Sequence, residues 1–378
     1  MENIFITGIR IEKYRNIENL EIELSQNERK HLILTGKNGS GKTSLISLMV
    51  DCLDLRYRWH KDNVTFEETT GLHGKTDGNT VNFNKSASIY DVLLFNIPAE
   101  HLFRVSESQG ITNIKERAKH KSFPRPNEFV FHNMLQTMVT MRIQQLEAKE
   151  NNDDRLFMQS ETWFKALKEV LATIYEGKEL DLKYMPQEYN YKLILDGYEF
   201  NLDQMADGFS AFFRIVSEIM EKMDYFTEYG CDYTLPGIAF IDEIETHMHI
   251  SMQKTVLGFL TKMFPNVQFI VTTHSPFIIN SLENAVVFDL SKREYLENPN
   301  QYSYESVIEG YYDIDMYSNK LKEKFDRYEE LAFCERSEGE DKEFSRLRIE
   351  FGAIPPANKE IFVAFKDVEA RRLTKKNG

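Results

Sequence analysis

Residues 36–43 read Gly-Lys-Asn-Gly-Ser-Gly-Lys-Thr, and they lie between an apolar run and a segment with helical character. The run His31-Leu32-Ile33-Leu34 predicts a buried strand, and Ser44-Leu45-Ile46-Ser47-Leu48-Met49-Val50 predicts a helix. The pattern Gly-x-x-x-x-Gly-Lys-Thr in a strand–loop–helix setting is typical of a phosphate-binding loop. Its glycines let backbone N–H groups curl around a phosphate, and the helix N-terminus adds its dipole. This stretch therefore predicts a nucleotide-binding α/β fold.

Two residues of this loop have a defined chemistry. Lys42 is expected to reach the β- and γ-phosphates of a nucleotide, and Thr43 is expected to ligate Mg²⁺ through its hydroxyl. The other residues expected to contact the nucleotide are Gly36, Asn38, Gly39, Ser40, Gly41 and Ser44.

The composition is that of a globular protein with an acidic surface. The chain has 378 residues, of which 42% are hydrophobic, and a net charge of -14. This length suits one large or two ordinary domains. The charge argues against a surface that binds nucleic acid everywhere, although a local basic patch is enough for DNA. We interpret the two basic clusters as a solvated face and a frayed tail; they are Arg117, Lys119, Lys121 and Arg125, and Arg371, Arg372, Lys375 and Lys376.

The cysteines and the N-terminus indicate a reducing compartment. Cys52, Cys231 and Cys334 are far apart and form no metal-binding spacing, so we expect a reduced, cytoplasmic setting. The start Met1-Glu2-Asn3-Ile4 shows neither a basic region nor a long apolar region, and we expect no signal peptide. We also expect no membrane span, because no apolar run approaches the required length.

The segments around the loop show strand patterns. Residues 4–24 alternate between apolar and polar, which predicts two antiparallel strands joined around Tyr14-Arg15-Asn16. Residues 51–90 are polar and rich in turns, and we expect irregular structure with short strands there. Val92-Leu93-Leu94-Phe95 predicts a buried strand.

Helical patterns occur in two parts of the chain. Residues 127–176 predict two helices, separated at the charged stretch 147–154, and residues 189–200 predict a strand or hairpin around Asp196-Gly197. The last part of the chain is rich in charge and shows helical spacing at 317–333, 341–350 and 357–372.

Between these parts, buried strands alternate with helices. Asp207-Gly208 opens a helix through Val216, and Gly237–Glu243 is an apolar strand that ends in two carboxylates. Gln268–His274 is a second apolar strand that ends in a histidine, and Val286–Phe288 is a further short strand. This alternation predicts a mostly parallel sheet covered on both faces.

The ends of these two strands carry candidate catalytic residues. Ligands bind at the carboxyl ends of strands in open α/β sheets, and two buried carboxylates need a positive partner such as Mg²⁺. Asp242 is expected to hold Mg²⁺, and Glu243 to orient or deprotonate the attacking water. His274 is expected to donate a hydrogen bond to a γ-phosphate; the alternative is a structural histidine.

Two further patterns leave alternatives open. The helix that opens at Asp207-Gly208 is either a plain capped helix or a second phosphate site, which a second protomer would then contribute. Glu245, His247 and His249 are either metal ligands or residues of a subunit contact, and we favour the contact.

In their order, these motifs resemble those of ATP-binding-cassette type ATPases of the recombination and overcoming-lysogenization group, relatives of the chromosome-maintenance ATPases. The resemblance covers residue 4 to about 290. Gly36–Thr43 is similar to the Walker A loop and Gly237–Glu243 to the Walker B strand. Residues 242–253 resemble the family pattern Asp-Glu-Pro-Glu-x-His-Leu-His-Pro-x-x-Gln, with isoleucine in place of both prolines. Thr272–Pro276 is similar to the histidine switch.

Two family motifs are less regular in this chain. Met205-Ala206-Asp207-Gly208-Phe209 is similar to the signature Leu-Ser-Gly-Gly-Gln, and Gly208 keeps its backbone contact. Ala206 replaces the serine whose hydroxyl reaches the opposite nucleotide in the family, which implies slow hydrolysis or the use of ATP as a clamp. We place the sensor glutamine of the family at Gln109.

The resemblance implies an α/β P-loop ATPase head of the ABC type, with a mixed sheet, N-terminal antiparallel strands, an inserted helical lobe and a C-terminal helical tail. We expect the head at residues 1–100 and 190–300, the lobe at 101–189 and a partner-binding tail at 301–378. The resemblance also implies ATP and Mg²⁺ as cofactors. It further implies a homodimer, or a higher oligomer of dimers, in which the Walker A loop of one copy and the Gly208 segment of the other share each ATP.

Short helical lobes and a helical tail make the chain similar to the Septu-type and retron-associated ATPases of bacterial antiphage systems. This implies an ATPase that acts as a sensor or scaffold for a separate effector, a nuclease or a toxin, with Lys42, Glu243 and His274 as catalytic residues. Two alternatives stay open: a DNA-repair ATPase that clamps duplex DNA, and a self-contained nuclease of the same group. Asp313-Ile314-Asp315 is a weak candidate for nuclease metal ligands. A nucleic acid partner stays open, and no membrane partner is expected.

Overall fold

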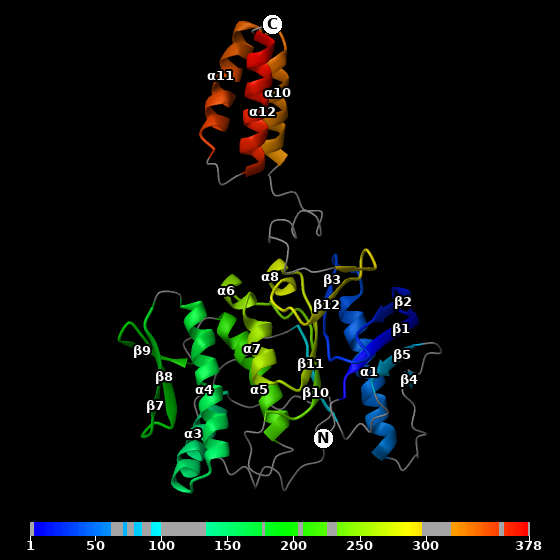
Figure 1. Ribbon diagram of the computed structural model, residues 1–378, viewed down its shortest axis with the longest axis vertical. Coiled ribbons are helices and arrows are strands. Elements are labelled where there is room, and N and C mark those ends of the chain that lie inside the picture. Colours follow the sequence, from blue (N-terminus) through cyan, green and yellow to red (C-terminus); the bar gives the residue numbers. More distant parts are fainter. Residues whose placement is uncertain are drawn as a thin grey trace. The chain divides into compact units, whose positions relative to one another are not determined.

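The computed structural model describes ten stretches of the chain: 4–61, 71–73, 79–84, 92–99, 134–175, 178–202, 207–224, 233–296, 319–354 and 359–376 (Figure 1). The chain divides into two compact units, Met1–Val307 and Ile308–Gly378. Within the described stretches, no helix is both long and apolar enough to cross a membrane.

A six-stranded sheet forms the centre of the first unit, with the strand order β13-β12-β3-β11-β10-β6. The strands are β3 (His31–Thr35), β6 (Leu93–Ile97), β10 (Gly237–Ile241), β11 (Val267–Thr272), β12 (Ala285–Asp289) and β13 (Glu294–Leu296). All pairs are parallel except β12 with β13. Every residue of β3, β10 and β11 is buried, as expected for parallel strands covered on both faces. The predicted α/β fold and its mostly parallel sheet are confirmed.

A second, antiparallel sheet covers one side of the unit, in the order β2-β1-β5-β4. Its strands are β1 (Ile6–Tyr14), β2 (Ile17–Glu23), β4 (Gly71–His73) and β5 (Thr80–Phe83). Helix α1 (Lys42–Lys61) shares one apolar core with both sheets, in which Leu45 and Met49 are fully buried. The antiparallel pairing of β1 with β2 confirms the predicted N-terminal hairpin.

Helix α1 is longer than the sequence predicts. We expected irregular structure from residue 51, but the helix continues to Lys61. The segment Lys42–Lys61 contains no glycine or proline, and Leu53 extends the apolar face of the helix into the core. The polar residues that suggested irregular structure lie along a helix instead.

Gln268 of β11 fastens the two sheets together. Its side-chain Oε1 accepts a hydrogen bond from the N–H of Ile6 (2.7 Å), and its Nε2 donates to the carbonyl oxygens of Ile6 (2.9 Å) and Lys30 (2.8 Å). Gln268 is fully buried, so these bonds satisfy a polar group that would otherwise destabilise the core.

The other face of the central sheet carries α5 (Asp207–Asp224) and α7 (Val256–Met263), as Figure 1 shows. Two four-residue helices, α6 (Ile250–Gln253) and α8 (Pro276–Ile279), follow β10 and β11. The predicted helix that begins at Asp207-Gly208 is confirmed as α5.

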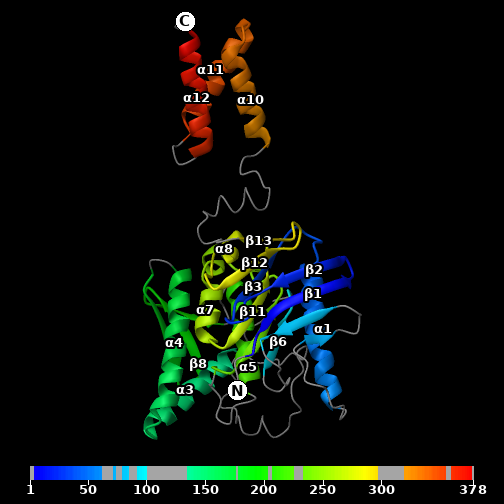
Figure 2. The same cartoon turned by 45° about the vertical axis from the view of Figure 1, so that its right-hand side comes forward.

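Beside these helices, α3 (Met134–Glu150) and α4 (Asp154–Ile174) pack on a three-stranded antiparallel sheet (Figure 2). The sheet contains β7 (Leu180–Met185), β8 (Asn190–Leu195) and β9 (Tyr198–Asn201). The predicted break between the two helices is confirmed, and the Asp153 side chain caps α4 by accepting from the N–H of Leu156. Because β7 pairs with β8, this sheet crosses the position where we placed the border between lobe and head.

The second unit is a bundle of three helices, α10 (Asn319–Phe333), α11 (Glu338–Gly352) and α12 (Lys359–Lys376). The three predicted helices are confirmed. Their core surrounds Tyr328, whose hydroxyl donates to Glu369 (2.7 Å). Burial favours a raised pKa for Glu369, but hydrogen bonds from Arg348, Tyr328 and Arg372 outweigh it and lower the pKa to about 2.

His31, at the start of β3, makes the stability of the first unit depend on pH. Its side chain is 5% exposed, and its Nδ1 accepts a hydrogen bond from the N–H of Phe269 (3.0 Å). Burial, together with the charges of Arg29 and Lys30, lowers its pKa from 6.5 to about 4. A protonated ring would be a donor at Nδ1 and could not keep this bond.

We therefore expect the first unit to lose stability as the pH falls from 6.5 toward 4. In that range the unfolded chain binds a proton at His31 that the folded chain does not, so acid favours unfolding. The loss through this residue amounts to about 3 kcal/mol and is complete near pH 4. Urea unfolding of the wild type and of His31→Gln at pH 7 and pH 5 measures it. A wild type with the same pH dependence as His31→Gln would contradict the expectation, and the exposed His247→Gln is the control.

Candidate nucleotide-binding site

The phosphate-binding loop lies between β3 and α1, where the sequence predicts it. Gly36, Gly39 and Gly41 have φ values of 135°, 79° and 103°, which side-chain-bearing residues rarely adopt. A Cβ on Gly36 would lie 2.8 Å from the Ser291 Oγ, and a Cβ on Gly41 would lie 2.9 Å from the Ile17 side chain. At Gly36 and Gly41, neighbouring residues leave no room for a side chain, and the positive φ disfavours one as well.

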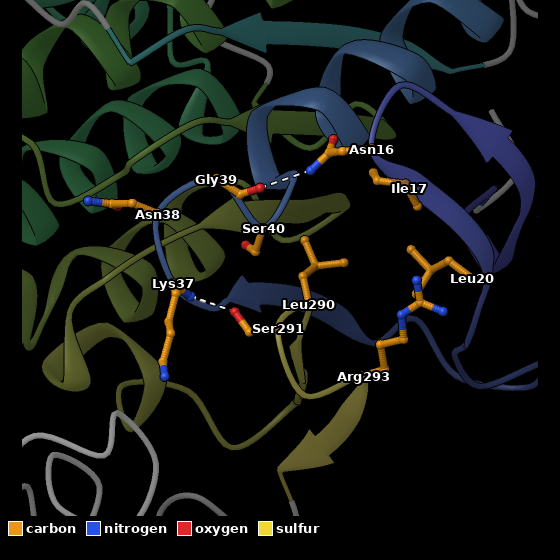
Figure 3. A pocket seen from close by; sticks show the side chains of 10 residues that line it. All are labelled: Asn16, Ile17, Leu20, Lys37, Asn38, Gly39, Ser40, Leu290, Ser291 and Arg293. Carbon is orange, nitrogen blue, oxygen red and sulfur yellow. Dashed lines mark hydrogen bonds between the residues drawn. The ribbon is translucent and has the colours of Figure 1, made fainter.

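Two distant segments hold this loop in place (Figure 3). From the tip of the β1–β2 hairpin, the Asn16 Nδ2 donates to the carbonyl oxygen of Gly39 (2.8 Å). From the β12–β13 turn, the Ser291 Oγ accepts from the N–H of Lys37 (2.6 Å). Asp289 fixes that turn, because its Oδ1 accepts from the N–H groups of Ser291 and Lys292.

These three segments line a pocket of about 350 Å³ beside the loop. Its walls are residues 37–40 of the loop, the hairpin residues Asn16, Ile17 and Leu20, and the turn residues Leu290, Ser291 and Arg293 (Figure 3). Its lining combines the apolar side chains of Ile17, Leu20 and Leu290 with polar residues and the cation of Arg293.

Lys42 follows the loop at the start of α1 and is buried. Its Nζ donates to the carbonyl oxygens of Gly36 (2.8 Å) and Lys37 (3.3 Å), so it braces the loop from inside. Burial lowers its pKa, and the negative charges of Glu243 and Asp242 oppose this shift. These charges act on Lys42 because Glu243 and Asp242 follow β10, which lies in the same parallel sheet as β3.

The neighbouring strand fixes the Asp242 carboxylate and the main chain of Glu243. Thr272, the last residue of β11, donates from its hydroxyl to the Asp242 Oδ1 (2.5 Å) and accepts from the N–H of Glu243 (2.7 Å). Asp242 is 5% exposed, and Glu243 has a φ of 48° that turns the chain at the end of β10. The hydroxyl of Thr246 also donates to the Glu243 Oε2 (3.3 Å).

His274 completes the group of predicted catalytic residues. Burial lowers its pKa, the charge of Lys42 lowers it further, and the charges of Glu243 and Asp242 oppose the shift. Its ring is therefore neutral at pH 7, with one N–H available as a donor. Parallel strands β3, β10 and β11 thus bring Lys42, Asp242, Glu243 and His274 to the same edge of the sheet.

The residues present fit a nucleotide with Mg²⁺. The Ser40 Oγ, inside the loop, is buried and has no hydrogen-bond partner within the described stretches, as expected of a group that meets a ligand. Thr43 and Asp242 offer a hydroxyl and a carboxylate, and oxygen ligands of this kind are those that Mg²⁺ prefers.

Some predicted site residues are not tested by this geometry. The described part of α5 begins at Asp207, but a contribution of Asp207 and Gly208 to the site requires a second copy of the chain. Gln109, Ala206 and Asp313-Ile314-Asp315 lie outside the described residues, as does the basic cluster at residues 117–125.

In the other basic cluster, Arg371 pairs with Glu329 and Asp367, and Arg372 pairs with Glu369. Both arginines therefore bind acids of their own bundle. The described stretches hold no group of three or more His, Cys, Asp or Glu side chains that could bind a metal ion, and this includes the open alternative at residues 245–249.

Sequence reasoning missed the residues that position the site. Asn16 and Ser291 hold the loop, and Thr272 holds the Asp242 carboxylate and the main chain of Glu243, yet none was assigned a role of its own. Only Thr272 left a signal, since a polar residue at the end of an apolar strand, directly before Thr273 and His274, is a candidate for the site.

A family model described as "AAA domain, putative AbiEii toxin, Type IV TA system" matches residues 82–280, more than half of the chain. The chain belongs to this AAA domain family. The matched stretch of the AAA domain contains β10 and β11 with Asp242, Glu243 and His274, while the phosphate-binding loop precedes it.

Among curated relatives, the AAA chain is similar to the Septu protein PtuA of Bacillus mycoides (strain KBAB4), with 24% identity over 351 residues that cover 86% of this chain and 47% of PtuA. It is also similar to the retron Vc95 probable ATPase of Vibrio cholerae serotype O1 biovar El Tor, with 24% identity over 244 residues, 64% of this chain and 44% of that protein. The chain thus spans a little under half the length of each relative. The predicted resemblance to Septu-type and retron-associated ATPases is confirmed.

One solved structure aligns with 79% of the AAA chain and with 100% of its own chain, at 14% identity and a TM-score of 0.39. It is the crystal structure of the SmcHead bound to the C-winged helix domain of ScpA.

Proposed function

We propose that this chain binds ATP with Mg²⁺, hydrolyses it between two copies of itself, and controls a separate effector, a nuclease or a toxin, in the cytoplasmic antiphage defence of a bacterium. The observation that carries the ATPase part is the parallel pairing of β3, β11 and β10, which brings Lys42, Asp242 and Glu243 to one edge of the sheet. A phosphate-binding lysine that faces a metal-binding carboxylate and a candidate base is the arrangement that phosphoryl transfer requires.

In this proposal, Lys42 leaves the carbonyl oxygens of the loop and binds the β- and γ-phosphates. Glu243 orients the attacking water and takes its proton, while the neutral His274 donates its N–H to an oxygen of the γ-phosphate. Thr43 and Asp242 would hold Mg²⁺, which when bound neutralises charge on the phosphate oxygens. Thr272 keeps Asp242 and the main chain of Glu243 fixed during the reaction.

The pocket beside the loop suits the base and ribose of the nucleotide. It adjoins loop residues 37–40, so a nucleotide with its phosphates in the loop could place the rest of the molecule there. Ile17, Leu20 and Leu290 offer apolar surface for a base, and Arg293 offers a cation at the rim.

In the proposed dimer, the segment that opens α5 has a role in binding the nucleotide. The main-chain N–H groups of Asp207 and Gly208, in the first described turn of α5, would bind the γ-phosphate held by the loop of the other copy. ATP binding would then close the dimer, and hydrolysis would release it.

The defence role is supported by the names of the relatives, a Septu protein and a retron ATPase. We propose residues 1–100 and 190–300 as the ATPase head, residues 101–189 as an inserted lobe joined to the head by the pairing of β7 with β8, and residues 301–378 as the partner-binding region. In the last of these, the bundle of α10, α11 and α12 has its own core and exposes Ile349 and Val363.

Mixing two inactive variants tests the shared site. We expect Lys42→Ala and Gly208→Glu each to be inactive alone, because every site then lacks one half. In a mixture, about half of the dimers contain one of each chain, and each of these has one intact site, so ATP turnover recovers to about a quarter of wild type. Phosphate release from the equimolar mixture measures it.

The control mixture combines Lys42→Ala with Thr43→Ala. Both changes lie in the same loop, so no dimer of the two has an intact site and turnover stays absent. An equal absence of turnover in the Lys42→Ala and Gly208→Glu mixture would contradict sharing between copies.

A further inference from the structure

Glu245 carries a contact that the proposed ATPase mechanism does not use. Its Oε1 accepts a hydrogen bond from the main-chain N–H of His274 (2.5 Å). Its second oxygen, Oε2, is buried and lacks a hydrogen-bond partner within the described stretches. Glu245 belongs to the segment that follows β10, and His274 belongs to the segment that follows β11. The bond therefore joins a side chain of the first segment to the main chain of the second.

The same two segments are joined at two further points. On one side of Glu245, the Thr272 hydroxyl bridges Asp242 and the N–H of Glu243. On the other side, the Gln253 Oε1 accepts from the Ser275 hydroxyl (2.6 Å), while its Nε2 donates to the carbonyl oxygen of Met248 (2.8 Å). The bond from the His274 N–H to Glu245 therefore lies between the contacts of Thr272 and the contact of Gln253 with Ser275.

Of these bonds, the one from Glu245 acts directly on His274. The preceding residue, Thr273, is fixed by its N–H to the carbonyl oxygen of Leu34 in β3 (2.9 Å). Past this point the main chain leaves the sheet, and the N–H of His274 finds its acceptor in Glu245 instead of a neighbouring strand. The bond therefore sets the direction in which the chain presents the His274 side chain.

We propose that Glu245 is a positioning residue, which acts through His274 by holding its main chain so that the ring meets the terminal phosphate. This inference rests on the proposed ATPase function. Its cause is the hydrogen-bond acceptor and not the negative charge, because the group that Glu245 contacts is a neutral main-chain N–H. Burial raises the pKa of Glu245, while hydrogen bonds from the His274 N–H and the Thr273 side chain oppose this shift. An amide oxygen in the same place would accept the same bond.

Three variants distinguish the effect of the hydrogen-bond acceptor at residue 245 from the effect of its negative charge. We expect Glu245→Ala to lower the kcat for ATP by about tenfold or more and to change KM by less than about threefold, because a displaced catalytic group slows chemistry more than binding. Glu245→Gln keeps an acceptor and should retain most of the wild-type kcat. Glu188→Ala, at an exposed hairpin residue, is the control for loss of an acidic side chain.

A double-mutant cycle tests the route through the histidine. In the His274→Ala background, Glu245→Ala should cause no further loss of kcat, because the group that it positions is gone. Additive losses would show that Glu245 acts independently of His274 and would overturn the proposal. A Glu245→Gln variant as slow as Glu245→Ala would overturn it as well, since the acceptor would then not be the cause.

A spectroscopic measurement keeps the test independent of turnover. With ¹⁵N-labelled histidine, the ring resonances of His274 are assigned by their loss in His274→Ala. We expect them to shift in Glu245→Ala and to stay near their wild-type positions in Glu245→Gln. Unchanged resonances in Glu245→Ala would refute the positioning role. If the resonances shift in Glu245→Ala but the wild-type chain hydrolyses no ATP, the contact is upheld and the proposed ATPase function is refuted.

Discussion

Lys42→Ala is expected to weaken ATP binding by at least about a hundredfold. Hydrogen bonds to charged groups contribute about 1.5–3 kcal/mol each, and the lysine would make them to two phosphates. The substitution also removes the two bonds by which Lys42 braces the loop against the carbonyl oxygens of Gly36 and Lys37. Titration with a fluorescent ATP analogue measures the affinity.

Two variants keep this test specific. Because Lys42 is buried, alanine leaves a space in the site, and Lys42→Met fills it without restoring the charge. Both variants should bind equally weakly. Lys262→Ala removes a lysine whose side chain is 59% exposed and pairs with Glu169, and it should bind ATP as the wild type does. Wild-type affinity in Lys42→Met would remove the phosphate-binding role of this residue.

Glu243→Gln is expected to lower the rate of ATP hydrolysis by about a hundredfold or more while ATP binding persists. Proton transfer by a positioned base contributes about 10²–10⁴-fold to a rate, and an amide cannot take the proton. Glutamine keeps the size of the side chain, and the bond from the Glu243 N–H to Thr272 is unaffected because it is a main-chain bond. The predicted consequence is a dimer that accumulates with bound ATP.

Phosphate release and light scattering in the presence of ATP test both parts. The turnover should fall and the mass should rise to that of two chains. Glu283→Gln changes an exposed carboxylate near the end of α8 and should alter neither quantity. Normal turnover in Glu243→Gln would refute its role as the base, and low turnover by a monomer would refute the dimer.

The parts of the fold that the sequence predicted are those with a strong local signal. The apolar runs of β3, β10 and β11 and the glycine spacing of the loop each lie within a few consecutive residues. Parallel pairing then places the ends of β10 and β11 together, so Asp242, Glu243 and His274 could be assigned to one site before the structure.

The missed features depend on contacts between distant parts of the chain or on short elements. The bond between Lys37 and Ser291 joins residues 254 positions apart, and no local pattern marks either partner. Strand β13 pairs with β12 and has three residues, which is too few for an alternating pattern. The end of α1 was missed because the sequence from residue 51 is rich in polar residues, as the sequence of a loop is.

The position of β3 in the central sheet has a consequence for synthesis of the protein. The strand that leads into the phosphate-binding loop pairs with β11 and β12, which are made more than 200 residues later. While the ribosome is still translating the first half, the nascent chain therefore has the loop and the β1–β2 hairpin but lacks β11, β12 and Ser291. The nucleotide pocket comes into existence only after residue 291 has emerged, and a prematurely terminated chain would carry the motif without the site.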